Sequence, residues 1–253
     1  MISIARANNK QPAANKIANP LVPARSGDFP WMVSIQSDGR HQCGGTILNA
    51  RTILTVARCT ISMINTTARL TVRYGSLNQS SGGTVVPIRQ ILLAPKFNQS
   101  QDFHSDWSLI KLAKNIVFDN PTTTTVAAAK LAPRSALPNL GQSVWTAGWS
   151  FITNGLPLLV PVMEKYSLNI VDRHACNGTY EGQVDGGLFC AAVPKNTADP
   201  CQLDIGGPVS TGTGTNAVVI GLFTFSLSCF QQGAPAIFTS IGQYRDAIDK
   251  LAK

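Results

Sequence analysis

The chain has 253 residues, of which 44% are hydrophobic and 13% are charged, a composition that excludes a disordered protein. Lys and Arg number 21 against 13 Asp and Glu, and the net charge of +8 favours acidic partners, such as anionic glycans or anionic protein surfaces, or serves solubility alone. No apolar run is long enough to span a membrane, and no nucleic-acid partner is expected.

The N-terminal segment, MISIARANNKQPAANK, is polar. It lacks the apolar core that a signal peptide needs. We therefore expect residues 1–16 to be a leader or propeptide-like segment, and we expect a secreted protein whose signal peptide is absent from this sequence.

Short alternating or β-branched runs follow this segment, separated by turn-forming residues. The clearest runs are WMVSIQ, TILTVA, RLTVRYG, GTVVPIRQILL and AVVIGLFTF. Their period and spacing are typical of β-sandwiches and β-barrels, so the sequence predicts an all-β fold.

A stretch rich in Pro, Thr and Ala occupies residues 113–142. Such a composition predicts an extended linker between two halves of similar size. We expect the N-terminal half to cover about residues 17–120 and the C-terminal half about residues 125–238.

One segment, at the C-terminus, has a helical pattern. Apolar residues recur there at helical spacing, at Ile241, Tyr244, Ile248 and Leu251, with polar residues between them. The pattern predicts a helix over about residues 241–252 that packs one face on the body, and no other helix is expected.

Six cysteines, an even number, occur without the CxxC pairs of a zinc or redox site, and we expect neither a metal nor a cofactor. They predict three disulfides and an oxidising, extracellular compartment. Four Asn-X-Ser/Thr sequons agree with secretion, at Asn65, Asn78, Asn98 and Asn177.

Five segments resemble those of the trypsin-like serine proteases, in the order of that family: GDFPWMVSIQ, CGGTILNARTILTVARC, DWSLIKL, TAGWS and DPCQLDIGGPVS. The resemblance runs from about Ile17 to the last helix and implies one trypsin-like domain, residues 17–253. It implies two six-stranded antiparallel barrels with the active site in the cleft between them. It also implies the disulfides Cys43–Cys59, Cys176–Cys190 and Cys201–Cys229.

Catalysis in that family needs a serine nucleophile, a histidine base and an orienting aspartate. The resemblance places the aspartate at Asp106, but Arg58 stands at the histidine position and Ile205 at the serine position. A guanidinium cannot act as a base near neutral pH, and an isoleucine has only hydrocarbon to offer. Leu203 stands where the family usually has the glycine whose N–H completes the oxyanion hole. We therefore predict a pseudoprotease rather than an enzyme.

The loss of the triad histidine leaves Asp106 without its usual partner. We predict that Arg58 forms a direct ion pair with Asp106 and partly closes the cleft. The alternative is that Arg58 turns to solvent while Asp106 accepts backbone donors. The chain's histidines, His41, His104 and His174, do not stand at the base position, and each is expected to be an ordinary surface or hydrogen-bonded residue.

The primary specificity pocket is also altered. Asp199 matches the acid that binds Arg or Lys side chains in trypsins, and Gly233 is retained on one wall. Ser226 on the other wall places atoms where the family leaves room. Either Asp199 still serves a usable pocket, or it is solvated or paired internally.

Activation in this family cuts after a basic residue, and the new amino terminus pairs with a buried acid. Lys16 and Ile17 match the cleaved junction, and Asp204 matches the acid of the buried ion pair. Asn19 and Pro20 replace the two flexible glycines of the family, so that insertion is an open question even if cleavage occurs.

These features predict a secreted, inactive protease homologue that acts by binding a macromolecule. The segment LTVRYGSLNQSSGG resembles mite digestive proteases, and the predicted features fit the inactivated protease paralogues of the scabies mite, which interfere with host complement. This resemblance implies a protein partner in complement or another host protease cascade. The alternatives are a basic glycan-binding or antimicrobial protein, and a weakly active serine protease.

Overall fold

The computed structural model describes residues 22–98, 103–119, 125–153, 156–194, 204–227 and 234–253. Its first half forms a closed antiparallel barrel with the order β2-β3-β4-β7-β6-β5. The strands are β2 (Met32–Ser37), β3 (Arg40–Asn49), β4 (Thr52–Thr55), β5 (Leu70–Tyr74), β6 (Thr84–Leu93) and β7 (Ser108–Leu112). Pairing of β2 with β5 closes the ring.

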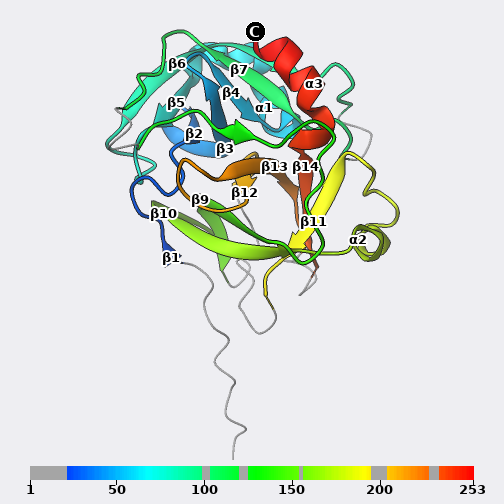
Figure 1. The fold of residues 1–253 in the computed structure, drawn as a ribbon. Helices are drawn as coiled ribbons and strands as arrows, with labels where there is room; N and C mark the ends of the chain where they lie inside the picture. The colour runs from blue at the N-terminus through cyan, green and yellow to red at the C-terminus, as the bar shows by residue number, and fades with distance from the viewer. Residues whose placement is uncertain (1–21, 99–102, 120–124, 154–155, 195–203, 228–233) are drawn as a thin grey trace, which may run out of the picture.

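The second half forms another six-stranded ring, drawn below the first in Figure 1. Its strands are β9 (Ser143–Thr153), β10 (Leu156–Ile170), β11 (Leu188–Ala192), β12 (Pro208–Ser210), β13 (Val218–Phe225) and β14 (Ala236–Ser240). The order is β10-β11-β14-β13-β12-β9, and the β9–β10 pairing closes it. Two short strands join this sheet, since β1 (Val22–Pro23) pairs with β10 and β8 (Lys130–Leu131) lies parallel to β13. The predicted fold of two six-stranded barrels is confirmed.

Alternation of side chains explains why these segments form barrel strands. In β5, Leu70, Val72 and Tyr74 are buried, whereas Thr71 and Arg73 between them are only partly buried. Successive side chains of a strand point to opposite faces, so the apolar set fills the barrel. The largest buried side chains include Trp31, Trp107 and Trp149, and a single apolar cluster extends through both barrels.

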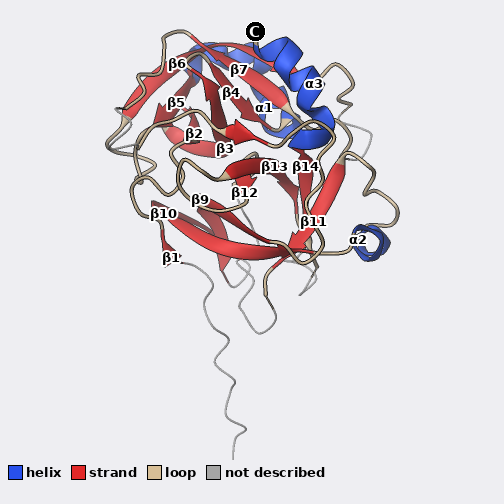
Figure 2. Cartoon of the chain, viewed as in Figure 1, coloured by secondary structure: helices blue, strands red, loops and turns tan. Residues whose placement is uncertain are grey.

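Helices cover three places on this β framework, as Figure 2 shows. They are α1 (Ala57–Thr60), followed by a 3-10 segment, η1 (Ile61–Arg69); α2 (Arg173–Thr179); and α3 (Ile241–Ala252). The expectation of a single, C-terminal helix was therefore wrong. Helices as short as α1 and α2 cannot display a helical repeat, and α2 depends on local capping, because the Asp172 carboxylate accepts a hydrogen bond from Ala175 N at 2.8 Å.

The predicted C-terminal helix is confirmed as α3. Ile241 and Ile248 are buried, and Tyr244 and Leu251 pack half-buried against the core. The helix starts directly after β14 of the second barrel and ends beside the first, where Lys111 Nζ donates to Ala252 O at 2.8 Å. None of the helices in the described ranges is long and apolar enough to cross a membrane.

Two of the three predicted disulfides lie in the described ranges and are confirmed. Cys43–Cys59 joins β3 to α1, and Cys176–Cys190 joins α2 to β11. Their sequence separations are 16 and 14 residues, and closing loops of this size stabilises a fold by about 3 kcal/mol each. The predicted Cys201–Cys229 pair falls outside the described residues.

The backbones of the two barrels meet at a pair of glycines. A Cβ on Gly44 of β3 would lie 2.7 Å from Gly207 Cα, so only glycine permits this approach. Gly206 has φ +80°, and a Cβ there would lie 2.0 Å from Thr55 Oγ1. Gly44 N also donates to Ile205 O at 2.9 Å. This contact fixes the loop that carries Asp204 and Ile205 against the first barrel.

Candidate functional site

Asp106 lies directly before β7, where the helix α3 and strand β14 of the second barrel hold the backbone. Tyr244 Oη on α3 accepts a hydrogen bond from Ser105 N at 3.0 Å, and Thr239 on β14 donates to Asp106 O at 3.0 Å. The Asp106 side chain is completely buried. Burial raises the pKa of this carboxyl above its ordinary value, and the charge and hydrogen bonds of Arg58 oppose that rise.

Arg58 lies in α1 and contacts this carboxylate with two donors. Its backbone N–H donates to Asp106 Oδ1 at 2.8 Å, and its Nε donates to Oδ2 at 2.7 Å. The predicted ion pair is confirmed, and the alternative with Arg58 turned to solvent is wrong. Because the Arg58 side chain is 28% exposed and that of Asp106 is fully buried, only the carboxylate is completely desolvated.

An aromatic cluster that the sequence analysis missed holds Arg58 from its other side. The guanidinium carbon lies 4.6 Å from the ring centroid of Phe103. Phe103 stacks on Phe225 with centroids 5.2 Å apart, and the ring of Tyr180 meets both edge-on. The sequence places Phe103 three residues before Asp106 and Phe225 directly before Ser226, but no sequence pattern indicates that the two rings meet.

Ile205 is half-buried and packs against the apolar core. Its side chain has no hydroxyl or thiol, so it supplies no nucleophile. Five further predicted residues fall outside the described residues. They are the site residues Leu203, Asp199 and Gly233, and the processing residues Lys16 and Ile17. Ser226 is half-buried, and its place in a specificity pocket stays a prediction.

Asp204 is buried, as expected for the acid of an ion pair. Its Oδ2 accepts a hydrogen bond from Trp149 N at 2.9 Å, and its Oδ1 lies 3.2 Å from His41 Nε2. Ser34 Oγ contacts His41 Nδ1 at 2.8 Å, so a serine, a histidine and an aspartate form a buried row. His41 is thus a hydrogen-bonded core histidine, and its pairing with Asp204 was not foreseen.

Neither of the other two histidines pairs with Asp106 in the part of the chain that the structure describes. His104 lies two residues before Asp106, but its Nδ1 pairs with Asp185 Oδ2 at 2.5 Å instead. His174 is exposed on α2. Among the residues that the structure places, Asp106 therefore has an arginine and not an imidazole beside it.

The trypsin family matches residues 20–248. The chain belongs to the trypsin family. Trypsin Blo t 3 of Blomia tropicalis is 32% identical over 225 residues, which cover 87% of this chain and 80% of the relative. Trypsin alpha of Drosophila melanogaster is 29% identical over 227 residues, or 88% and 83% of the two chains.

Solved structures of the trypsin family share the fold. A scabies mite inactivated protease paralogue superposes with a TM-score of 0.78 at 20% identity, covering 92% of this chain and 97% of the other. Neuropsin from mouse brain superposes with a TM-score of 0.76 at 23% identity, covering 91% and 98%. At these identities the likeness establishes the trypsin fold alone.

The sequence relatives are named as trypsins, but family membership by itself does not decide whether this chain is active. The chemistry depends on the residues that this trypsin-family chain places at the centre. Asp106 binds the guanidinium of Arg58, a group that donates hydrogen bonds and has no acceptor. The arrangement can hold charge in a buried position, but Arg58 cannot accept a proton from a nucleophile.

Proposed function

We propose that this protein is a secreted, proteolytically inactive member of the trypsin family that acts by binding a protein partner. The observation that supports inactivity best is the Arg58–Asp106 pair, with its 2.7 Å contact at the position of the base. Ile205 adds to it, because acyl transfer needs a nucleophile as well as a base. In a comparable protease, loss of the triad serine or histidine lowers kcat by about a millionfold.

The surroundings of Arg58 support a fixed rather than an adaptable centre. The aromatic cluster of Phe103, Tyr180 and Phe225 packs against the guanidinium, and Tyr180 Oη also accepts a hydrogen bond from Leu227 N at 3.2 Å. A substrate that reached Asp106 would have to displace a charge-assisted pair from a buried carboxylate. Recognition through the surface loops around this rigid core is the role that remains.

The partner that we propose is a component of a host protease cascade such as complement. The name of one structural neighbour, an inactivated protease paralogue of the scabies mite, supports a non-catalytic role on this fold. Binding of this kind needs the folded scaffold and does not need the triad.

The test is surface plasmon resonance with purified complement components, with the cleft between the two barrels either open or blocked by an inhibitor. We expect binding to persist when a tight trypsin inhibitor is present, and to persist in the variant with Arg58→His, Leu203→Gly and Ile205→Ser. Displacement by the inhibitor would place the interface in the cleft and contradict surface recognition. Absence of binding to every component of the cascade would contradict the proposed partner.

A further inference from the structure

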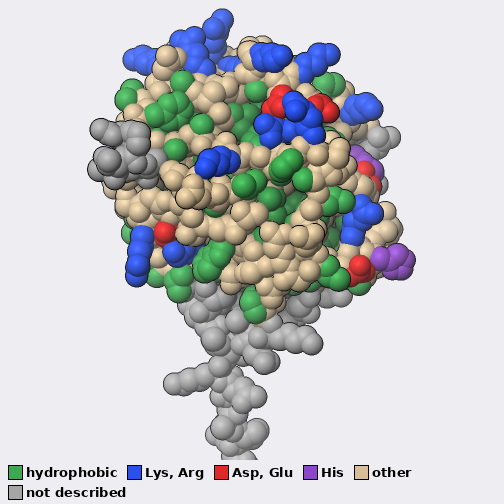
Figure 3. Space-filling view, in the orientation of Figure 1, with side chains coloured by type: hydrophobic (Ala, Val, Ile, Leu, Met, Phe, Trp, Pro, Cys, Tyr) green, Lys and Arg blue, Asp and Glu red, His purple; other side chains and the backbone are tan. Residues whose placement is uncertain are grey.

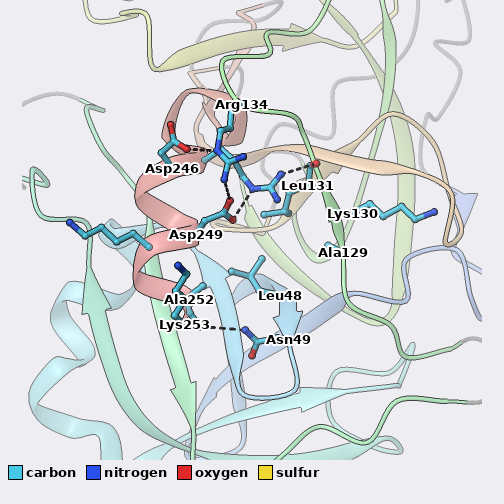
Figure 4. A pocket seen from close by; sticks show the side chains of 12 residues that line it. Leu48, Asn49, Ala129, Lys130, Leu131, Arg134, Asp246, Asp249, Ala252 and Lys253 are labelled. Carbon is cyan, nitrogen blue, oxygen red and sulfur yellow. Dashed lines mark hydrogen bonds and ion pairs between the residues drawn. The ribbon is translucent and has the colours of Figure 1, made fainter.

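Two hollows adjoin at the C-terminal end of α3, away from the degenerate triad. Their volumes are about 760 Å³ and about 500 Å³. Both are lined by Asn49, Ala252 and Lys253, so they meet at the last turn of the helix. Figure 4 shows the larger one, with Leu48, Ala129 and Leu131 among its lining residues and the polar side of α3 along its edge.

Basic side chains dominate the lining of both hollows. They are Arg51, Arg89, Lys111, Lys130, Arg134, Arg245, Lys250 and Lys253, and we call this set the basic groove. The acidic lining residues are Asp246 and Asp249. Elsewhere in the described residues, acidic and basic side chains are equal in number, so the excess positive charge of that part of the chain is concentrated at this groove.

The two acids of the basic groove are already engaged. Arg134 pairs with Asp246 and with Asp249, the latter at 3.0 Å, and Arg245 Nε contacts Asp249 at 2.8 Å. Figure 3 shows blue side chains along the edge near the end of α3, and the red side chains next to that edge lie beside the blue ones of the helix.

Five exposed cations of the groove have no acidic partner within the described ranges. They are Arg51, Arg89, Lys130, Lys250 and Lys253. Their charge therefore stays available to an anion from outside the protein.

Lys111 of β7 connects the end of α3 to the first barrel. Its Nζ donates to Ala252 O at 2.8 Å and to Thr52 Oγ1 at 3.1 Å, and burial lowers the pKa of this amine. Thr52 of β4, Lys111 of β7 and Gln90 of β6 are neighbours in the sheet register. Ala252 O at the end of α3 accepts hydrogen bonds from Asn49 of β3, Thr52 of β4 and Lys111 of β7, so the cations around it stand on a rigid support.

We propose that the basic groove binds a sulfated polysaccharide. Sulfate groups repeat along such a chain, and the guanidiniums of Arg51 and Arg89 offer paired donors to sulfate oxygens while the lysines act as point charges. The exposed amides of Asn49 and Gln90 line the same hollow and can bind sugar hydroxyls.

The lining disfavours other polyanions. Among the described residues, no aromatic side chain lines either hollow, so bases of a single-stranded nucleic acid would find no stacking partner there. The large apolar side chains that are exposed in the described part of the chain do not line the hollows either, so these residues provide nothing there for insertion into a membrane. The site also shares no residue with the Arg58–Asp106 centre, and it is independent of the proposed function.

The test is calorimetric binding of a size-defined heparin oligosaccharide to the whole protein at several salt concentrations. In the groove variant Arg89→Gln, Lys250→Gln and Lys253→Gln, we expect affinity to fall at least about tenfold and the dependence on salt to flatten. The matched control removes the same charge from exposed sites elsewhere, with Arg40→Gln, Lys96→Gln and Arg173→Gln, and it should bind within about twofold of the parent.

Three outcomes would overturn the proposal. One is an equal loss in the control variant, which would mean attraction by net charge alone. Another is equal binding of the same oligosaccharide after desulfation. The third is tighter binding of single-stranded DNA of equal charge at the same salt concentration, which would make the groove a nucleic-acid site. Thermal unfolding of each variant verifies that the fold is intact.

Discussion

Replacement of Arg58 by leucine isolates the contribution of the central ion pair. The Asp106 carboxylate is completely buried and accepts the Arg58 Nε at 2.7 Å, and leucine retains only the backbone donor at position 58. Breaking a buried pair from one side typically costs about 3–5 kcal/mol, and because the Arg58 side chain is 28% exposed we expect the lower end, about 3 kcal/mol.

The loss of folding stability in Arg58→Leu should be larger at pH 7 than at lower pH. Without the guanidinium, the pKa of Asp106, which burial already raises, rises further. A folded-state pKa above the unfolded value means that the folded state holds more protons in the interval between the two values. Stability of Arg58→Leu should therefore recover as the pH falls from 7 towards the unfolded pKa of about 4.

The assay is urea unfolding at pH 7 and pH 5 with the disulfides intact. The double variant Arg58→Leu/Asp106→Asn should be more stable at pH 7 than Arg58→Leu, because it buries no unpaired charge. Arg173→Leu, at an exposed site on α2, is the control and should change stability by less than about 0.5 kcal/mol. An Arg58→Leu protein as stable as this control would refute the reasoning.

Two further changes test the contacts around the centre. Phe103→Ala removes the ring that stacks on Phe225 and lies under Arg58, and it should lower the free energy of unfolding by about 3 kcal/mol in urea titrations; a loss below 1 kcal/mol would contradict a packed cluster. His41→Leu withdraws the imidazole from the buried Asp204 carboxylate and should cost about 2 kcal/mol, measured as a lower midpoint in urea. No change in midpoint would mean that Asp204 does not depend on His41.

The barrel strands were predictable because their evidence is local. The segment RLTVRYG alternates apolar and polar residues, and β5 (Leu70–Tyr74) follows that alternation residue by residue. The Arg58–Asp106 pair was also predictable, since the family resemblance placed both residues at the same centre and side chains of opposite charge attract each other there.

Contacts between distant segments were not predictable in this way. Phe103, Tyr180 and Phe225 come from three separate segments, and no periodicity links them. The basic groove is another example: the composition gave its charge, but Asn49 and Ala252 meet across 203 residues of sequence. The short helix α2 was not predicted for a different reason. Capping by Asp172 and the Cys176–Cys190 disulfide stabilise it without an apolar repeat.

The central claim is that Arg58 and Ile205 leave this trypsin-family protein without a hydrolytic centre. Its most direct test is peptide hydrolysis by the purified protein beside two repaired variants, with a serine-directed phosphonate as a label. We expect no turnover and no labelling of the parent, and little recovery in Arg58→His/Ile205→Ser, because we propose that Leu203 occupies the oxyanion position. Adding Leu203→Gly should restore measurable activity. Turnover by the parent protein that follows it through two orthogonal chromatography steps would contradict the claim.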